Sequence, residues 1–370
     1  MFEILVVSAI PLVLGGVAWV LCKKIVWFEW VLGAISAFLC MVIATYAAEA
    51  GLTSDYYTQT GLVTKTVHHP EWVERYTDVY TDSKGNTRTR TRYRTHEEHW
   101  MCHSSLGDSW EISQAKFIEV ATKIGPVRKF NGNKSGFHSG DPHIYVSANE
   151  NAYSIPVTSQ YAFENRPIYG DKNLFQFVDE NPAVKTYPYP VPSSRFASER
   201  VINSPVSILE WDRMNAVVNN KGCSVIIAGY DSADASVAEQ QRAAWKNGKK
   251  TDLVICYHKN SDGSGWCKVF GWTDSEECKK NIERIVVDSK EVNDEIVPKI
   301  MHEIMASYKA KNWSDFDYIS VSIPTGYYIV IFIIVFLTQA AYWFWAAGNE
   351  FDKTSFGVAK NFYNSRIRRY

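Results

Sequence analysis

The stretch from Tyr327 to Ala347, YYIVIFIIVFLTQAAYWFWAA, contains no charged residue. A bilayer core about 30 Å thick needs about 20 apolar residues in helical form, so this stretch is long enough to cross a membrane. Two more apolar stretches lie near the N-terminus: Ile4 to Cys22 is uncharged, and Ile25 to Ala48 carries only Glu29. The sequence therefore predicts a membrane protein with three transmembrane helices, the first two forming a tight hairpin.

The first apolar stretch has a cleaved signal peptide as its alternative interpretation. Signal peptides begin with basic residues, whereas this chain begins Met1-Phe2-Glu3 and carries Lys23 and Lys24 after the apolar run. We therefore expect a retained helix. In the second stretch, Gly33 and Ala37 are small residues four positions apart, which favours close packing against another helix.

Basic residues in the short flanks predict the orientation. Lys23 and Lys24 lie between the first two helices, and the tail after the third carries Lys353, Lys360, Arg366, Arg368 and Arg369. Because basic flanks stay in the cytoplasm, the region from about Gly51 to Asp317 is expected outside it. In a bacterium this chain is then a multi-pass inner-membrane protein with a periplasmic central region and a cytoplasmic C-terminal tail.

The predicted division of the chain follows from these spans and from a change of composition near Asn181. The run NPAVKTYPYPVPSS contains four prolines, which is typical of an extended connector. Strand and turn patterns precede it, and strand–helix–strand patterns follow it. We expect a transmembrane hairpin (1–49), a β-rich domain (50–180), a Pro/Tyr-rich linker (181–205), a small α/β domain (206–318), a transmembrane helix (319–348) and a basic tail (349–370).

The segment DSKGN, Asp82 to Asn86, predicts a hairpin in the β-rich domain. Gly85 suits the left-handed position of a three-residue loop, which places Asp82 opposite Asn86. In that register Asp78 faces Arg90, Glu74 faces Arg94 and Trp72 faces His96.

The arginine row of TRTRTRYRT, residues 87–95, therefore has acidic partners on the same sheet face. A solvated face is the simplest interpretation. An anionic partner, such as the phosphates of lipopolysaccharide or of lipid headgroups, stays open. Nucleic acid is disfavoured, because only Tyr93 is interleaved with the arginines and the net charge of the chain is −1.

Histidines and glutamates gather at the base of this hairpin. Continuing the register places Thr77 opposite Thr91, Val73 opposite Thr95, Glu71 opposite Glu97 and His69 opposite His99, with Cys102 and His103 nearby. Two imidazoles and two carboxylates on one face could bind a divalent metal ion. The alternative is hydrated polar residues near the end of a sheet, because Pro70 interrupts the ladder.

The second domain has an α/β pattern. The apolar run CSVIIAG, Cys223 to Gly229, predicts a buried strand. The elements expected after it are a helix (233–247), a strand (252–257), a turn (260–265), a returning strand (266–271), a helix opened by a capping box from Thr273 to Glu276, and a helix through Val292, Ile296, Ile300 and Ile304 that begins or kinks at Pro298.

Five cysteines lie in the predicted extracytoplasmic region: Cys102, Cys223, Cys256, Cys267 and Cys278. Cys256 and Cys267 flank the predicted turn, and they face each other if the turn has an even number of residues. A disulfide between them is one expectation; buried free thiols are the alternative, since an odd total leaves at least one cysteine unpaired.

Several segments resemble a family of uncharacterised membrane proteins of tailed bacteriophages. They are WKNGKKTDLV (245–254), KVFGWTD (268–274), Thr53-Ser-Asp55, Gly140-Asp-Pro142, the tyrosine–proline run and the membrane hairpin. The resemblance covers about residues 25–318 and implies a phage setting without an assigned activity. Members often carry a cysteine-rich insert where this chain has Gly85 to His103, and nearly all of those cysteines are absent here.

The element order after Cys223 also resembles the TPM fold of membrane-anchored envelope and thylakoid proteins, some of which are described as phosphatases or metal binders. That resemblance implies a site at Asp231 and Asp234, just beyond the first strand. The glycine-rich segment usual after the TPM hairpin is replaced here by FGWTD, residues 270–274.

A binding protein is the function that the sequence favours. No nucleophile elbow, phosphate-binding loop, zincin motif or dinucleotide fingerprint is present. We expect no required cofactor, and as partners the lipid bilayer, an unknown membrane or envelope protein and a second copy of the chain. Engaging or modifying the host envelope, for example to exclude later infection, fits this setting. The alternatives are a metal-dependent hydrolase or metal-binding protein and a membrane assembly scaffold.

The predicted topology leads to a direct test. A reporter that is active only outside the cytoplasm should be active when fused at Ser83, and protease added to intact spheroplasts should cleave between residues 51 and 317, because both flanking basic clusters hold the cytoplasmic side. A fusion at the C-terminus is the matched control and should be inactive. Full protection of the central region would overturn the assigned orientation.

Overall fold

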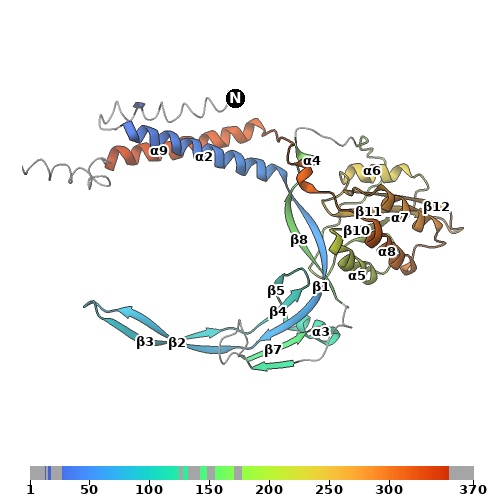
Figure 1. Cartoon of the computed structure of the whole chain (residues 1–370), viewed down its shortest axis with the longest axis horizontal. Helices are drawn as coiled ribbons and strands as arrows, with labels where there is room; N and C mark the ends of the chain where they lie inside the picture. Colours follow the sequence, from blue (N-terminus) through green and yellow to red (C-terminus); the bar gives the residue numbers. More distant parts are fainter. Residues whose placement is uncertain are drawn as a thin grey trace, which may run out of the picture. The chain divides into compact units, whose positions relative to one another are not determined.

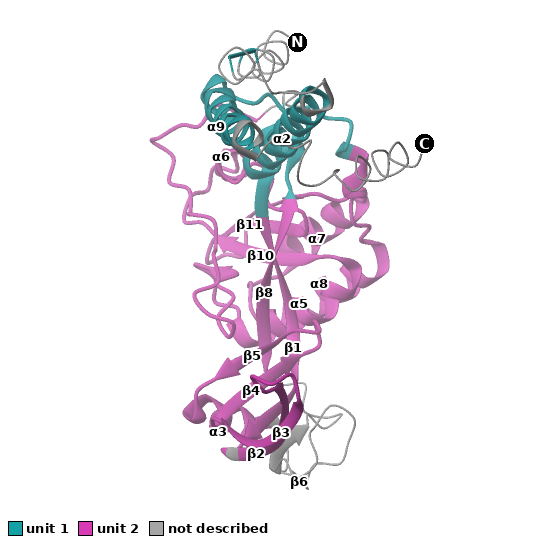
Figure 2. Ribbon diagram, turned by 90° about the vertical axis from the view of Figure 1, so that its left-hand side faces the viewer, with its two compact units in different colours: residues 1–55, 164–175, 316–370 teal, residues 56–163, 176–315 magenta. Residues whose placement is uncertain are grey.

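The computed structural model describes residues 13, 16–17, 27–124, 128–131, 142–147, 155–170 and 177–349. Two compact units emerge from it: residues 1–55, 164–175 and 316–370 form unit 1, and residues 56–163 and 176–315 form unit 2 (Figure 2). All but three residues of the first expected span lie outside the described residues, as do Lys23, Lys24 and the basic tail from residue 350.

Unit 1 is built on two long apolar helices, α2 (Trp27–Thr53) and α9 (Thr325–Asn349). They run side by side (Figures 1 and 2). Both are long and apolar enough to cross a membrane, by length and composition. Large apolar side chains such as Phe38, Ile43 and Leu337 stay exposed on the pair, as is expected of surfaces that lipid would cover.

The contact between α2 and α9 uses small residues, as the sequence predicts. Ala37 is buried against Ile331 and Val335. A Cβ atom added at Gly33 would lie 2.7 Å from the Trp343 ring, so only glycine allows this approach. Gln339 adds a polar contact, because its Nε2 donates to Ser36 Oγ at 2.9 Å. Hydrogen bonds of this kind hold apolar helices together where burial of apolar surface contributes little.

Arg166 fastens the ends of unit 1 together. It lies in the short helix α4 (Arg166–Tyr169). Its guanidinium forms ion pairs of 3.0 Å with Glu49 near the end of α2 and with Glu164. The same group donates to the carbonyl of Ile319 at 3.0 Å, shortly before α9 begins. Three chain segments therefore meet at one side chain.

The first sheet of unit 2 is built around the long strand β1 (Ser54–His69), which pairs with β4, β7 and β8. The strand order is β5-β4-β1-β7-β6. Helix α3 (Gln114–Ile124) contributes Phe117 and Val120 to a core that includes Val63, Cys102 and Val157. The other strands are β4 (His99–Ser104), β5 (Ser109–Ile112), β6 (Arg128–Asn131), β7 (Pro142–Ser147) and β8 (Pro156–Glu164).

Residues 72–96 form a separate two-stranded ribbon, which we call the arm (Figure 1). Its strands β2 (Trp72–Thr81) and β3 (Thr87–His96) are hydrogen-bonded only to each other. The predicted register is confirmed: Trp72 pairs with His96, Glu74 with Arg94 and Asp78 with Arg90. So is the turn, since Asp82 N donates to Asn86 O at 2.9 Å and Gly85 has φ of 81°.

The second sheet confirms the predicted α/β pattern. Strands β9 (Val201–Ile202), β10 (Ser224–Gly229) and β11 (Asp252–Lys259) are parallel, and β12 (Gly265–Gly271) returns antiparallel at the β11 edge. Side chains of α5 (Ile208–Val218), α7 (Glu276–Asp288) and α8 (Val297–Ser307) share one core with one face of the sheet. The core on the other face includes α6 (Ser236–Ala244).

Details of these helices differ from the prediction. Helix α6 is shorter than expected, beginning at Ser236. Ser275 rather than Thr273 caps α7, because Thr273 Oγ1 donates instead to Lys309 O at 2.6 Å. Helix α8 begins at Val297 with Pro298 in its first turn, as predicted.

The Pro/Tyr-rich run packs along the second sheet as part of its core. Tyr187 N donates to Gln241 Oε1 of α6 at 2.7 Å, and Tyr187 Oη donates to Gly229 O at 2.8 Å. Trp245 Nε1 donates back to Tyr187 O at 2.8 Å. Residues 185–192 of the run form neither helix nor strand, and these contacts bind the run to the α/β sheet.

Asp252 and Arg200 form a buried ion pair at the start of β11. Asp252 is 0% exposed and Arg200 is 1% exposed, and Arg200 Nη1 lies 3.5 Å from Asp252 Oδ1. Tyr189 Oη and Lys249 N donate to Asp252 Oδ2 at 2.6 and 2.8 Å. Arg200 Nη2 donates to Thr58 O of β1 at 3.2 Å. This pair therefore links the second sheet to the Pro/Tyr-rich run and to β1.

We predict that Asp252→Ala lowers the free energy of unfolding by about 3–5 kcal/mol, because it leaves a buried guanidinium without a counter-charge. The double variant Arg200→Met/Asp252→Leu should lose less, since it removes both charges. Thermal unfolding of the detergent-solubilised chain gives the comparison. Lys123→Ala, which breaks the exposed pair with Glu119, is the control and should change stability by about 0.5 kcal/mol at most. An Asp252→Ala loss no larger than the control's would contradict this role.

Candidate functional site

The carboxyl ends of the parallel strands open onto a cleft of about 430 Å³. In open α/β sheets this edge is where ligands bind. Asp231, immediately after β10, lies in its wall. The other lining residues are Asn203, Pro205, Gly229, Tyr230, Tyr257, Lys259, Asn260, Ser261, Lys290, Glu291, Val292 and Asn293.

Most polar groups around this cleft are engaged by the protein itself. Lys259 Nζ donates to the carbonyls of Gly263, Val287 and Ser289 at 2.8, 2.7 and 2.7 Å. His258 is held through both ring nitrogens, Nδ1 to Tyr230 O at 2.7 Å and Nε2 to Asn260 Oδ1 at 3.0 Å. These contacts fix the loops of the cleft, which is a structural role.

Asp234, which was predicted to share a site with Asp231, is bonded within the turn before α6. Asp234 accepts from Ser236 N at 2.9 Å and from Ser236 Oγ at 2.6 Å, and these bonds lower the pKa of its carboxyl group. Asp234 therefore closes the turn before α6 and is not among the residues that line the cleft. Asp231 lies in the cleft wall and Asp234 in the turn, so the ligand set that the TPM resemblance implies stays a prediction.

The structure pairs His69 with His99 at the base of the arm, as predicted, but gathers no group of three ligands there among the described residues. His69 and His99 are paired in register on β1 and β4, and their rings stack with centroids 4.5 Å apart. Glu71 and Glu97 are exposed and lie between strands. The glutamates that contact imidazole rings in this region belong to two other histidines: His68 lies 2.7 Å from Glu98, and His96 lies 3.0 Å from Glu74.

No group of three or more histidine, cysteine, aspartate or glutamate side chains is placed to hold a metal ion in the described part of the chain. Cys102 and His103 are not part of such a group, and burial raises the pKa of the Cys102 thiol to about 12. Binding of a divalent ion stays a prediction, and we derive no chemistry through one.

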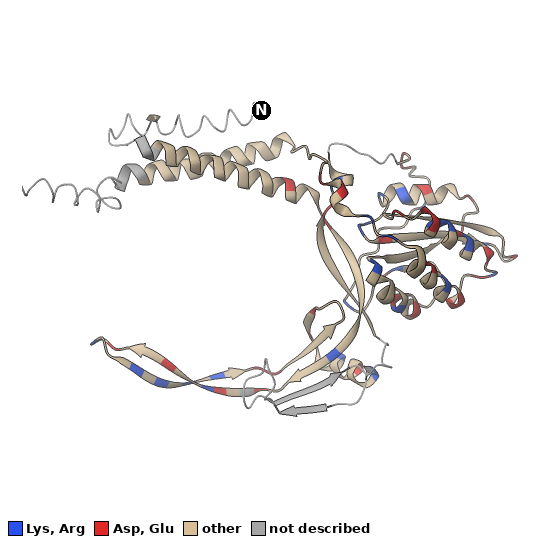
Figure 3. Ribbon diagram, in the orientation of Figure 1, with Lys and Arg blue, Asp and Glu red and all other residues tan. Residues whose placement is uncertain are grey.

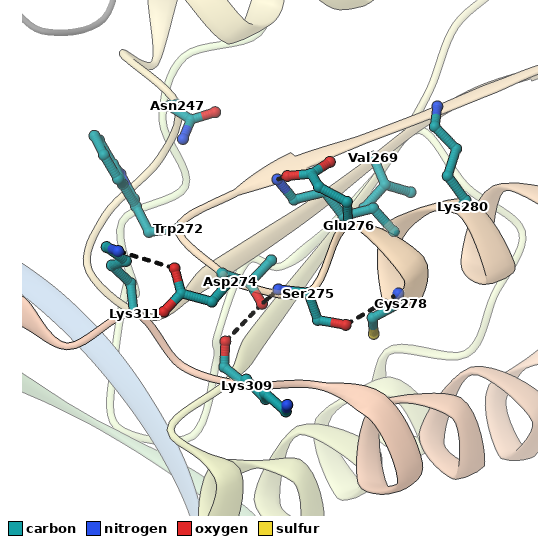
Figure 4. A network of polar contacts seen from close by, with 12 residues as sticks. Asn247, Val269, Trp272, Asp274, Ser275, Glu276, Cys278, Lys280, Lys309 and Lys311 are labelled. Atoms are coloured by element: carbon teal, nitrogen blue, oxygen red, sulfur yellow. Dashed lines mark hydrogen bonds and ion pairs between the residues drawn. The ribbon is translucent and has the colours of Figure 1, made fainter.

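A second cleft, of about 560 Å³, lies at the start of α7. Lys311 Nζ pairs with Asp274 at 2.9 Å and Ser275 Oγ accepts from Cys278 N at 3.3 Å (Figure 4). Glu276 and Glu277 line the cleft together with Lys221 and Lys309. Its charges are mixed and its serine caps the helix, so the contacts are those of a helix start and give no ligand preference.

The predicted disulfide between Cys256 and Cys267 is wrong. The loop between β11 and β12 has an odd number of residues, so Cys256 pairs with Lys268 and Cys267 pairs with Tyr257. Neighbouring strand residues point to opposite faces: Cys256 packs in the α6 core and Cys267 in the opposite core. All six cysteines in the described residues have free thiols.

Comparison of the chain with known protein families, with curated proteins and with solved structures gives no match in any of the three.

We predict that alkylation at pH 8 labels both Cys256 and Cys267 once the chain is unfolded without reductant, because neither is bonded. In the folded chain labelling of Cys256 should be at least about 100-fold slower, since burial raises the pKa of its thiol to about 12 and only the thiolate reacts. Peptide mass spectrometry reads both, with a reduced sample as control. If Cys256 and Cys267 are unlabelled in the unreduced sample and labelled in the reduced one, they form the predicted disulfide after all.

Proposed function

We propose that the chain is a phage-encoded binding protein of the bacterial inner membrane. It displays unit 2 on the periplasmic side, where it engages or modifies the host envelope, for example to exclude a second infection. Its partners are the lipid bilayer and an envelope or membrane protein, with a second copy of the chain as a further partner. No nucleic acid is involved.

The observation that carries this proposal is the contrast between the two units. Helices α2 and α9 expose apolar side chains over most of their length, which suits an anchor in lipid. Unit 2 has two sheets with their own buried cores, and it carries the exposed arm. A folded region that is anchored in the membrane and exposes a protein surface is the architecture expected of a protein that presents a binding surface.

The engaged polar groups support binding over catalysis. Catalytic acids and bases need a reactive group that reaches substrate at a matched pKa. Lys259, His258 and Asp234 instead serve the backbone or the turns of the α/β sheet. Asp231, which lies in the cleft wall, favours the alternative of a TPM-like metal-dependent hydrolase. A membrane assembly scaffold is the other alternative.

We predict that producing the chain in a host cell before infection lowers the yield of a second infection by the same phage. Removing residues 206–318 should abolish the effect, whereas Asp231→Ala should leave it intact, because a binding surface does not depend on one carboxylate. Plaque counts on cells with matched amounts of membrane-inserted protein give the measurement.

The reverse pattern, loss with Asp231→Ala in a stably inserted chain, would favour the hydrolase. Elemental analysis of the purified, chelator-washed chain then decides: near-stoichiometric metal supports the hydrolase, and its absence removes it. Recovery of the chain only as a large complex of defined size, with no effect on infection, would favour the scaffold.

A further inference from the structure

The arm exposes both of its faces. Every side chain of β3 except His96 is exposed, and on β2 Val73 and Val79 are 55% and 61% exposed. A two-stranded ribbon is marginally stable by itself in water. One that holds ten residues of pairing on each strand is therefore expected to gain stability from a partner surface.

Charge distinguishes the arm from the rest of the chain. It holds six cationic side chains and three carboxylates, a surplus of three positive charges. Since the whole chain has a net charge of −1, the remainder carries −4. Figure 3 shows the arm's cations along both strands. The cations are Arg75, Lys84, Arg88, Arg90, Arg92 and Arg94, and the carboxylates are Glu74, Asp78 and Asp82.

All three carboxylates of the arm contact basic side chains of the arm itself. Asp78 forms ion pairs with Arg90 and Arg92, at 2.9 and 2.8 Å, and Asp82 forms one with Arg88 at 2.9 Å. Glu74 lies opposite Arg94 in the register but contacts His96 instead.

Three cations are thus left over: Arg75, Lys84 and Arg94 form no ion pair with any described residue. Hydrated guanidinium and ammonium groups in excess of local acids are available to external phosphates.

The side chains between the charges belong at a membrane interface. Even-numbered residues of both strands share one face, because directly opposed residues point to the same side. That face carries Tyr76 and Tyr80, 39% and 38% exposed, beside the arginine row, and Arg90 lies 5.0 Å from the Tyr80 ring. Tyr93, 69% exposed, is on the other face. Tyrosine and arginine together suit the headgroup layer, where rings and phosphates are both within reach.

We propose that the arm is a docking element for an anionic phospholipid surface, a step that rests on the proposed membrane-anchored binding role and names one of its partners. Guanidinium and ammonium groups of the arm contact headgroup phosphates, and its tyrosines lie among the headgroups. The arginine row repeats about every 7 Å along β3, two residues at about 3.4 Å each, so several headgroups are contacted at once. The net attraction comes from the three cations that form no ion pair with a described residue: Arg94 on the face of the tyrosine pair, Arg75 on the other face with Tyr93, and Lys84 in the turn.

The test uses the full chain in nanodiscs of zwitterionic phosphatidylcholine and measures capture of added vesicles. Vesicles containing about one-third phosphatidylglycerol should be captured, and pure phosphatidylcholine vesicles should not. The triple variant Arg75→Gln/Lys84→Gln/Arg94→Gln keeps every ion pair of the arm and removes its charge surplus. It should weaken capture about 100-fold, from about five-fold for each charge.

The matched control is the triple variant Lys268→Gln/Arg284→Gln/Lys299→Gln in the α/β sheet and its helices. These cations are exposed and form no ion pair with a described residue, so capture should stay within about two-fold of the unaltered chain. Equal weakening by both triple variants overturns the proposal, as does capture that ignores vesicle charge. If the arm binds soluble polyphosphate but captures no vesicles, the lipid proposal is rejected and the ligand is a free polyanion. Arm-dependent dimers without capture replace it by a second copy.

The capture assay contains no host factor, so its result is separate from the infection experiment. If vesicles are not captured but the chain still lowers the yield of infection, the arm does not bind lipid and the proposed function is unaffected. If vesicles are captured but infection is unchanged, the lipid contact of the arm is supported and the proposed effect on infection is rejected.

Discussion

The burial of Arg200 against Asp252 is the constraint on which the arrangement of unit 2 depends. A charged pair taken out of water is costly, and its mutual attraction compensates only when the geometry and further hydrogen bonds are good. At 3.5 Å the pair is loose, and the closer contacts are those to Tyr189 and Thr58. The pair therefore favours one arrangement of β1, the Pro/Tyr-rich run and β11, because any other leaves a buried charge unpaired. Specificity, more than net stability, is what it contributes.

Local rules were enough to predict the elements whose partners are close in sequence. The arm's register follows from one turn, since Gly85 fixes the loop and the loop fixes every pair up to Trp72 and His96. The buried strand from Cys223 and the start of α8 at Pro298 follow in the same way from apolar runs and proline chemistry. The close contact at Gly33 was also visible, although not that its partner is the Trp343 ring. The two apolar helices were recognisable by length and composition alone.

The failures share a different origin. A loop of odd rather than even length separates Cys256 from Cys267 by one strand position, and one position reverses the face. At the base of the arm, the predicted register places Glu71 and Glu97 beside His69 and His99, whereas the carboxylates that contact imidazoles are Glu74 and Glu98, and they contact His96 and His68. Arg200 was missed entirely, because nothing local distinguishes an arginine that will be buried from one that will be solvated. Side-chain partners that are set by tertiary contacts leave no periodic signal.

The distribution of engaged and available polar groups unites these observations. In the α/β sheet, Lys259 and His258 are bound to the protein's own carbonyl and amide groups, so they hold loops in place and have little capacity left for a ligand. On the arm the relation is reversed, since cations outnumber carboxylates and the surplus lies in solvent. A partner that meets the described part of the chain in water therefore encounters lysine and histidine groups of the α/β sheet that are already bonded to the protein, and an arm whose cations outnumber its carboxylates. Recognition by an anionic surface follows from that imbalance more directly than from any single residue.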